Sequence, residues 1–336
     1  MRKHVIITGG AGFIGSHLVD RLLAEGGWNV TVVDNFAPLY PRAAKEANLA
    51  LHKHDPTFRL EEGDILDGTT VEGVLQRMGQ GPVVLVHLAA RVGVRQSLLD
   101  PIGYHRTNVT GTLALLELAR KYRVQRFVLA SSSSVYGEHP AVPWKESLGD
   151  LHPISPYAVS KWTAEAFARV YARLHGLDTA VLRFFTVYGP RQRPDLAIHS
   201  FFRKISEGQP IRQFGDGSTR RDYTYVDDII DGVRAAMEAP LTSSNGHGAH
   251  EVFNLGNSAT VTLRELIDAI EREAGRKAII EQCPAQAGDV SQTYANVDKA
   301  GQFLGFVPKT RLAAGLHQFA QWYQGLVPEA GHLTLP

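Results

Sequence analysis

A glycine-rich turn between a predicted strand and a predicted helix constrains this chain more than any other feature. The apolar run His4–Thr8 favours a strand, and Phe13–Glu25 places apolar residues at helical spacing. Glycines at the junction leave no Cβ between the backbone and a ligand, so the N–H groups that open the helix can face the negative charge of a pyrophosphate. A tight turn without a ligand is the alternative. The residues expected to contact the ligand are Gly9, Gly12, Phe13, Ile14 and Gly15.

Short β-branched runs alternate with longer helical patterns through the first half of the chain. This alternation is typical of a parallel sheet with crossover helices, and continuous apolar runs indicate strands buried on both faces. We therefore predict an α/β fold built on a doubly wound parallel sheet. The further predicted strands are Val30–Asp34, Phe58–Glu62, Val83–Leu88, Arg126–Ala130 and Ala180–Phe184, and the further predicted helices are Thr69–Met78, Ile102–Tyr122 and Tyr157–His175.

The pattern loosens after about residue 185 into a region punctuated by proline and glycine. This region contains short helices and one clear strand, Glu251–Leu255. We interpret residues 1–185 as the first domain, with later segments returning to it, and residues 186–330 as a smaller α/β lobe packed over it.

An acidic residue ends the second predicted strand, where a dinucleotide fold places its ribose-binding group. The carboxylate of Asp34 can accept hydrogen bonds from the adenosine diol and repels a 2′-phosphate, so the position favours NAD over NADP. The alternative is a cap for the turn that begins at Asn35.

Composition excludes several classes of protein. Lysine and arginine number 35 against 34 acidic residues, and this net charge of +1 argues against a nucleic-acid partner. No apolar run approaches the roughly 20 residues of a membrane helix, and glycines interrupt the apolar N-terminal stretch, so we expect neither a membrane span nor a signal peptide. Because Cys283 is the sole cysteine and the 14 histidines lack metal-ligand spacing, we expect a cytoplasmic protein without a metal site.

Two residues at the start of a predicted helix carry the candidate chemistry. Tyr157 and Lys161 stand four residues apart, which places both on one helix face. A phenol with a pKa of about 10 is a poor base at neutral pH, but an ammonium and a cationic nicotinamide both favour the phenolate. The pair therefore predicts an acid/base group, and a surface aromatic–lysine pair is the alternative.

A serine-rich segment, Ser131–Gly137, follows the predicted strand Arg126–Ala130 directly. Ligands of a doubly wound sheet bind at the carboxyl ends of its strands, so hydroxyls here can bond a sugar or polarise its reacting oxygen. A serine-rich turn without a ligand is the alternative.

The chain resembles the extended short-chain dehydrogenase/reductase family, and within it the nucleotide-sugar 4-epimerases, over about residues 3–325. The resemblance rests on the order and spacing of four motifs, which are Gly9–Gly15, His87–Ala90, Ser131–Gly137 and Tyr157–Lys161. It implies a Rossmann domain that holds NAD and a smaller C-terminal lobe that holds a UDP-sugar.

The resemblance also implies a mechanism. Tyr157 would take the proton of the sugar 4-hydroxyl while a hydride passes from C4 to the nicotinamide, and return of the hydride to the opposite face of the 4-keto sugar would invert C4. Ser132 aligns with the catalytic serine or threonine, and Lys161 would hold the nicotinamide ribose and lower the pKa of Tyr157. The remaining implied cofactor contacts are Asn35, Asp64, Ile65, Leu88, Ala89, Ala90 and Asn108.

Two serines separate this chain from the related 4,6-dehydratases. Those enzymes carry an Asp-Glu pair directly after the catalytic Ser or Thr, whereas this chain has Ser133 and Ser134. Without an acid to protonate a leaving hydroxyl, dehydration is not expected. We expect both serines to contact the substrate.

The choice of sugar rests on the segment around Thr186. Most similar UDP-hexose epimerases have Asn there, whereas Thr followed seven residues later by Arg193 resembles the UDP-glucuronate 4-epimerases. A guanidinium matches a carboxylate geometrically, so we expect these two residues to bind the C6 carboxylate. Two fragments support the resemblance, one containing Arg95 and the other Asp289. Surface salt bridges are the alternative for both arginines.

The position usually occupied by a diphosphate-binding arginine in the hexose epimerases is Gln286 in this chain. Diphosphate binding is therefore expected to rest on Arg221.

The predicted reaction is interconversion of UDP-glucuronate and UDP-galacturonate. A UDP-glucose 4-epimerase is the main alternative. A UDP-glucuronate decarboxylase is less favoured because similar decarboxylases carry Asn at the Thr186 position. A non-catalytic NAD-binding protein would not need Ser132, Tyr157 and Lys161 together. Resemblance to homodimers joined through two long helices, here about 102–122 and 157–175, predicts a homodimer.

Overall fold

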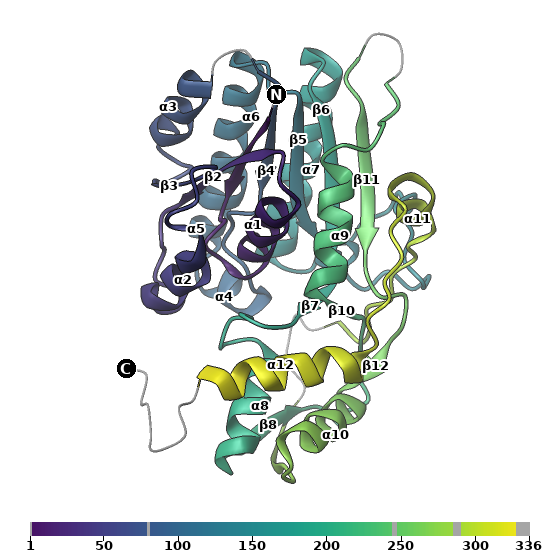
Figure 1. The fold of residues 1–336 in the computed structure, drawn as a ribbon. Helices are drawn as coiled ribbons and strands as arrows, with labels where there is room; N and C mark the ends of the chain where they lie inside the picture. Colours follow the sequence, from purple (N-terminus) through teal and green to yellow (C-terminus); the bar gives the residue numbers. More distant parts are fainter. Residues whose placement is uncertain (1, 79–80, 244–246, 285–289, 327–336) are drawn as a thin grey trace.

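A seven-stranded sheet with the order β11-β6-β5-β4-β1-β2-β3 forms the centre of the molecule (Figure 1). The computed structural model of this 336-residue chain describes residues 2–78, 81–243, 247–284 and 290–326. Every neighbouring pair of strands in the sheet is parallel, which confirms the predicted doubly wound fold. The strands are β1 (Lys3–Thr8), β2 (Trp28–Asp34), β3 (Phe58–Glu62), β4 (Val83–His87), β5 (Arg126–Ser132), β6 (Asp178–Phe184) and β11 (His250–Leu255).

Helices cover both faces of the sheet because its strands are apolar on both sides. In β4, Val84 and Val86 pack into one core while Val83 and Leu85 pack into the other. Helices α1 (Phe13–Glu25) and α9 (Val226–Ala236) cover the near face in Figure 1, and α3 (Thr69–Met78), α6 (Gly111–Lys121) and α7 (Pro156–His175) cover the far face. Within the described ranges, no helix is long and apolar enough to cross a membrane.

Four strands begin one or two residues before the predicted start, and two end at a different residue from the one predicted. Strand β4 ends at His87 rather than Leu88. Strand β5 continues past Ala130 because Ser131 and Ser132 still pair with β6. The serine-rich segment therefore begins inside the sheet and leaves it through a short 3₁₀ turn, Ser133–Tyr136.

The strand predicted near residue 251 joins the central sheet. Strand β11 pairs in parallel with β6 over its whole length, so the chain returns to the first domain after building much of the lobe. The sequence pattern predicts a strand here but does not specify its pairing partner, because such patterns are local. The partner, β6, lies about 70 residues earlier in the chain.

The long helix predicted over 102–122 is interrupted. It begins as α5 (Pro101–His105), where the Asp100 side chain accepts a hydrogen bond from the Gly103 N–H group at 2.9 Å, and continues as α6. Between the two, Arg106–Thr110 form a π-helical turn. Such turns are rare and occur mostly at functional sites.

The lower part of the molecule in Figure 1 is a smaller α/β lobe. Its helices share an aromatic core in which the Phe202 and Phe319 rings lie 5.5 Å apart. Its helices are α8 (Ala197–Glu207), α10 (Leu263–Ala274) and α12 (Leu312–Leu326), and its paired strands are β8 (Pro210–Phe214) with β13 (Ile279–Cys283) and β9 (Arg220–Arg221) with β12 (Val261–Thr262). The remaining elements are α2 (Arg42–Leu49), the 3₁₀ turn Ala50–His52, α4 (Val94–Leu99), α11 (Asp298–Leu304), β7 (Thr186–Tyr188) and β10 (Tyr223–Tyr225).

A buried histidine joins the first strand to the helix layer. The hydroxyl of Thr112 donates its one hydrogen to the Asn108 carbonyl at 2.6 Å. In its 3.0 Å bond with Nε2 of His87 the hydroxyl is therefore the acceptor, and Nε2 carries the proton. Nδ1 of His87 is then the acceptor for the Thr8 hydroxyl at 2.8 Å. The imidazole is therefore neutral. Burial lowers the pKa of His87 to about 3, and the positive charge of Lys161 lowers it further.

This burial makes stability depend on pH. Below a pH of about 6.5 the imidazole takes up a proton only in the unfolded chain, so acid favours unfolding until the folded pKa near 3 is reached. Between about pH 6.5 and pH 4.5 the free energy of unfolding should fall by about 2–3 kcal/mol more in the wild type than in the variant His87→Gln. Urea unfolding at both pH values measures the difference. His317→Gln, at a position 61% exposed, is the control, and an equal loss in wild type and His87→Gln would contradict the assignment.

Candidate active site

The glycine-rich turn packs too closely for a side chain at Gly9 or at Gly15. Gly9 has a φ of +73°, and a Cβ there would lie 2.7 Å from the amide nitrogen of Ala89. A Cβ on Gly15 would lie 2.4 Å from the Gly9 carbonyl oxygen. Gly12 precedes the first residue of α1 and offers no capping side chain. The backbone of this turn, Phe13 and Ile14 included, is therefore open to an anion at the helix start, and it fits a dinucleotide pyrophosphate.

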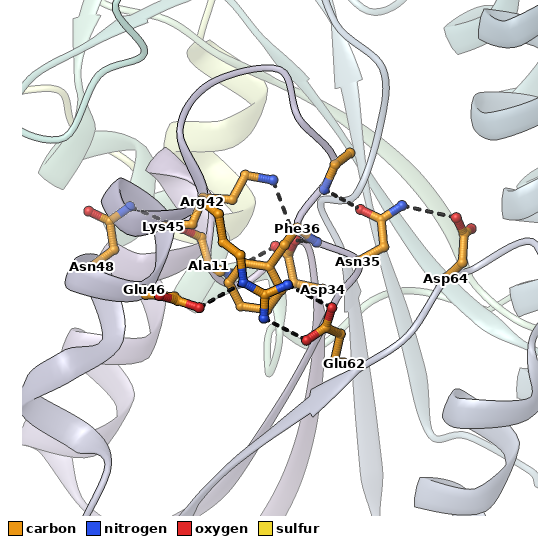
Figure 2. Close-up of polar contacts among 11 residues, drawn as sticks. Ala11, Asp34, Asn35, Phe36, Arg42, Lys45, Glu46, Asn48, Glu62 and Asp64 are labelled. Carbon is orange, nitrogen blue, oxygen red and sulfur yellow. Dashed lines mark hydrogen bonds and ion pairs between the residues drawn. The ribbon is translucent and has the colours of Figure 1, made fainter. Parts of the chain in front are cut away.

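The acid at the end of β2 is held in place by three contacts (Figure 2). Asp34 accepts hydrogen bonds from the N–H groups of Ala11 at 3.2 Å and Phe36 at 2.9 Å, and Nζ of Lys45 lies 3.5 Å from its carboxylate. The carboxylate therefore braces the glycine-rich turn, and its contact with an adenosine ribose stays a prediction. Sequence analysis missed Lys45, because its side chain reaches Asp34 only through the packing of α2 against α1.

Two further predicted cofactor contacts, Asn35 and Asp64, bond to each other next to this acid. The Asn35 side-chain amide donates to Asp64 at 2.9 Å, and Arg42 forms two hydrogen bonds to Glu62 at 2.8 and 2.7 Å (Figure 2). Ile65 is buried in the core, and a Cβ on Gly111 would lie 2.7 Å from its Cδ1 atom. The Ile65 side chain is thus directed into the core rather than toward the surface.

The π-helical turn positions Asn108 against the loop that follows β4. Its amide donates to the Arg91 carbonyl at 2.9 Å and to the Ser160 hydroxyl at 3.0 Å, and its oxygen accepts from the Arg91 N–H group at 2.8 Å. Both amide hydrogens are thus used within the protein. The loop Leu88–Ala90 is fixed at its other end by Thr8, which accepts from the Ala89 N–H group at 3.4 Å. In this structure Asn108 positions the predicted cofactor loop.

Helix α7 presents the predicted acid/base pair. Its first turn is capped by Ser155, whose hydroxyl accepts from the Ala158 N–H group at 3.2 Å, so Tyr157 lies at the helix start. Lys161 follows one turn later and donates to the Ala130 carbonyl at 2.9 Å. Burial lowers the pKa of Lys161 to about 8, opposed by the negative charge of Glu165.

The expected lowering of the Tyr157 pKa by Lys161 is not found. Burial raises the pKa of Tyr157, while a hydrogen bond with Ser132 and the charge of Arg193 lower it. The lysine ammonium is instead directed at the Ala130 carbonyl, to which it donates a hydrogen bond. The Ser132 hydroxyl thus bonds to Tyr157, its catalytic role stays a prediction, and Arg193 is an additional cation that acts on the phenol.

A buried ion pair lies behind these residues. Arg183 on β6 forms two hydrogen bonds to Glu165 on α7, at 3.0 and 2.7 Å, and their side chains are only 5% and 6% exposed. The Ser131 hydroxyl donates to the same carboxylate. This pair therefore ties α7 to the ends of β5 and β6.

A cavity lies between the serine turn and the lobe. Four of the predicted substrate residues line it, which are Ser133, Ser134, Thr186 and Arg221. Trp144 and Ile154 add apolar surface to its wall. A cavity with hydroxyls, one guanidinium and apolar walls suits a polar sugar attached to a charged diphosphate.

Two predicted arginines lie elsewhere. Arg95 is directed at the Phe214 ring, 4.8 Å from its centre, and its side chain thereby contacts the lobe. Arg193 is buried and forms two hydrogen bonds to Asp195, at 3.0 and 2.7 Å. Neither is among the described residues that line the cavity. The predicted Asp289 falls outside the described residues.

An aromatic residue beside Tyr157 was also missed. The Tyr104 ring lies edge-on to that of Tyr157, with centres 6.2 Å apart, and its hydroxyl donates to the Val92 carbonyl at 2.8 Å. A lone tyrosine in a helical pattern carries no sequence signal for such a contact. Among the described residues, no cluster of histidine, cysteine or acidic side chains is arranged to hold a metal ion.

Known proteins share this fold and sequence. The model of the NAD dependent epimerase/dehydratase family matches residues 5–256. A UDP-glucuronate 4-epimerase from Thermodesulfobacterium geofontis is 39% identical over 321 residues, covering 95% of both chains. The Bacillus cereus UDP-glucuronic acid 4-epimerase, solved with UDP-glucuronic acid and NAD, is 35% identical with a TM-score of 0.88, covering 96% of this chain and 100% of that one.

A UDP-glucose 4-epimerase from Thermotoga maritima, solved with UDP-glucose, is 34% identical with a TM-score of 0.85, covering 96% of this chain and 99% of that one. These similarities confirm the predicted resemblance to nucleotide-sugar 4-epimerases and the prediction of NAD as cofactor. The close-packed glycine-rich turn and the matches over nearly the whole chain agree: this protein belongs to the NAD dependent epimerase/dehydratase family.

Proposed function

We propose that this protein is a UDP-glucuronate 4-epimerase, which interconverts UDP-glucuronate and UDP-galacturonate. The observation that carries the proposal is a buried guanidinium, that of Arg193, whose charge acts on the phenol of Tyr157. The C6 carboxylate of a uronate lies one carbon beyond C5, next to the reacting C4, so a cation close to the base can bind it. A hexose offers only a neutral hydroxymethyl group there. The relatives named UDP-glucuronate 4-epimerase support this substrate.

The chain's own groups divide the work of the reaction. Bound NAD supplies a hydride acceptor for C4 and a positive ring charge. The backbone of the Gly9 turn holds the pyrophosphate, and Lys161 keeps two donors for the nicotinamide ribose after its bond to Ala130. Tyr157 accepts the proton of the 4-hydroxyl, with the Ser132 hydroxyl bonded to it. Because burial raises the pKa of Tyr157, the positive charges around it are needed to form the phenolate.

The second lobe is proposed to hold the UDP-sugar. Arg221 lines the cavity opposite the serine turn, which places a cation for the diphosphate. Ser133 and Ser134 line the same cavity and provide hydroxyls but no carboxylic acid, which supports epimerisation over dehydration. We propose the division of the chain near residue 186 on this basis.

We propose that two copies of the chain associate through α5 and α7. Large apolar side chains lie exposed on these helices, although such residues are usually buried. Their spacing along α7 forms one stripe, as expected for helix packing. The exposed residues are Ile102, Val159, Trp162, Val170 and Leu174.

We also propose a cytoplasmic location, because the described thiol of Cys283 is free. Fractionation of cells that express the tagged protein tests this location.

Tyr157→Phe should lower turnover by about 10²–10⁴-fold, because it removes the group that accepts the proton. NAD should remain bound, since the glycine cradle is unchanged, and wild-type turnover should need no added NAD because the hydride returns within each cycle. Product formation and the NAD released on denaturation are the measurements. An active Tyr157→Phe enzyme would show that another group takes the proton.

Arg193→Ala should weaken the use of UDP-glucuronate far more than that of UDP-glucose, by about 2–5 kcal/mol in kcat/KM, because only the uronate loses a charged partner. Kinetics with each sugar alone measure the effect. Arg264→Ala removes an arginine from an exposed pair on α10 and serves as the matched control. Equal effects on both sugars, or a wild type that prefers UDP-glucose, would replace the proposal by a UDP-glucose 4-epimerase.

Trp162→Asp should convert the dimer to a monomer, because a charge within the α7 stripe is costly to bury against a second copy. Light scattering coupled to gel filtration measures the mass. Val307→Asp places the same charge at an exposed valine outside the stripe and should leave the dimer intact. A monomeric wild type would refute the proposed assembly.

A further inference from the structure

The guanidinium of Arg193 is already occupied by a carboxylate of its own loop. Its Nε atom donates to one oxygen of Asp195 at 3.0 Å, and a terminal nitrogen donates to the other oxygen at 2.7 Å. The N–H group of Leu196 closes the turn by donating to the Arg193 carbonyl at 3.2 Å. A fork of two parallel bonds is the contact that a guanidinium makes with a free carboxylate.

The two partners differ in their access to solvent. The Arg193 side chain is 10% exposed, whereas that of Asp195 is 50% exposed. A buried guanidinium without a counter-charge is unfavourable, so the arginine needs its partner whenever the site is empty. The half-exposed aspartate does not need the arginine to the same extent, because water solvates it.

The charges of the pair also reach the tyrosines at and around the reacting centre. The charge of Arg193 acts on both Tyr157 and Tyr104, and that of Asp195 acts on Tyr104 and on Tyr40 of the cofactor half. A substrate carboxylate that approaches Arg193 therefore meets a cation that is already neutralised.

We propose that Asp195 is a built-in stand-in for the C6 carboxylate of the substrate. Asp195 pairs with Arg193 while no uronate is bound. When a uronate enters, one or both hydrogen bonds between Asp195 and the guanidinium break, and the substrate carboxylate takes their place. The inference rests on the proposed function, because it requires Arg193 to bind that carboxylate.

Two consequences follow from this exchange. Because Asp195 competes for the guanidinium, a uronate binds more weakly. A neutral hexose is tolerated because the ion pair between Arg193 and Asp195 remains formed beside it. The exchange also serves turnover. The 4-keto sugar must release its carboxylate in order to present its other face, and Asp195 then neutralises the arginine while the sugar turns.

Asp195→Asn keeps the shape of the side chain and removes its charge. The KM for UDP-glucuronate should fall about three- to fivefold, the range of a half-exposed ion pair, and kcat should fall because the sugar is released less readily. The KM for UDP-glucose should rise, since Arg193 is then unneutralised beside a hydroxymethyl group. Asp195→Glu, which restores the charge, should return both values toward wild type. Asp268→Asn, which changes an aspartate of similar exposure that pairs with Arg264 on α10, is the control.

A merely structural role predicts the opposite result. If Asp195 only holds Arg193 in position, Asp195→Asn raises the KM for UDP-glucuronate, and this outcome overturns the inference. Equal changes for both sugars overturn it as well. A failure of the proposed function is recognised separately, by a wild type without uronate preference or by an Arg193→Ala enzyme that treats both sugars alike. Bound NAD and circular dichroism establish that each variant is folded.

Discussion

The ion pair between Glu165 and Arg183 is the interaction on which the geometry of the active site depends. It joins α7, which carries Tyr157 and Lys161, to the ends of β5 and β6. Desolvation of two charges is repaid only when several hydrogen bonds satisfy them, and here the carboxylate accepts from the guanidinium and from Ser131. A helix held this way cannot slide along the sheet without leaving a buried charge unpaired.

A second constraint is the parallel direction of the seven strands. Because all carboxyl ends lie at one edge, segments far apart in the chain meet there. Gly9 follows β1, Asp34 ends β2, Ala89 follows β4 and Ser132 ends β5. Their mutual contacts, such as the Asp34 bond to the turn and the Thr8 bond to Ala89, make this edge a single braced surface.

Charge is distributed unevenly over this surface. Near the glycine-rich turn, where the cofactor is expected, acidic side chains contact lysine or arginine, as in the Asp34–Lys45 and Glu62–Arg42 pairs. At the predicted substrate site, the buried Arg193 pairs with the half-exposed Asp195. A firmly braced end suits a cofactor that is retained through each cycle, whereas an exchangeable pair suits a sugar that must turn within its site.

The sequence by itself determined the features that depend on neighbouring residues. The glycine turn, the buried strands, the helical spacing of Tyr157 and Lys161 and the hydroxyls after β5 are local patterns, because backbone conformation and side-chain periodicity act over a few residues. Tertiary structure alone decided that β11 enters the central sheet, that Lys45 contacts Asp34, and that the Asn108 amide donates to the Arg91 carbonyl. It also decided that burial raises the pKa of Tyr157 while Arg193 lowers it. Pairing and desolvation join residues distant in the chain, and no local pattern encodes which of them will meet.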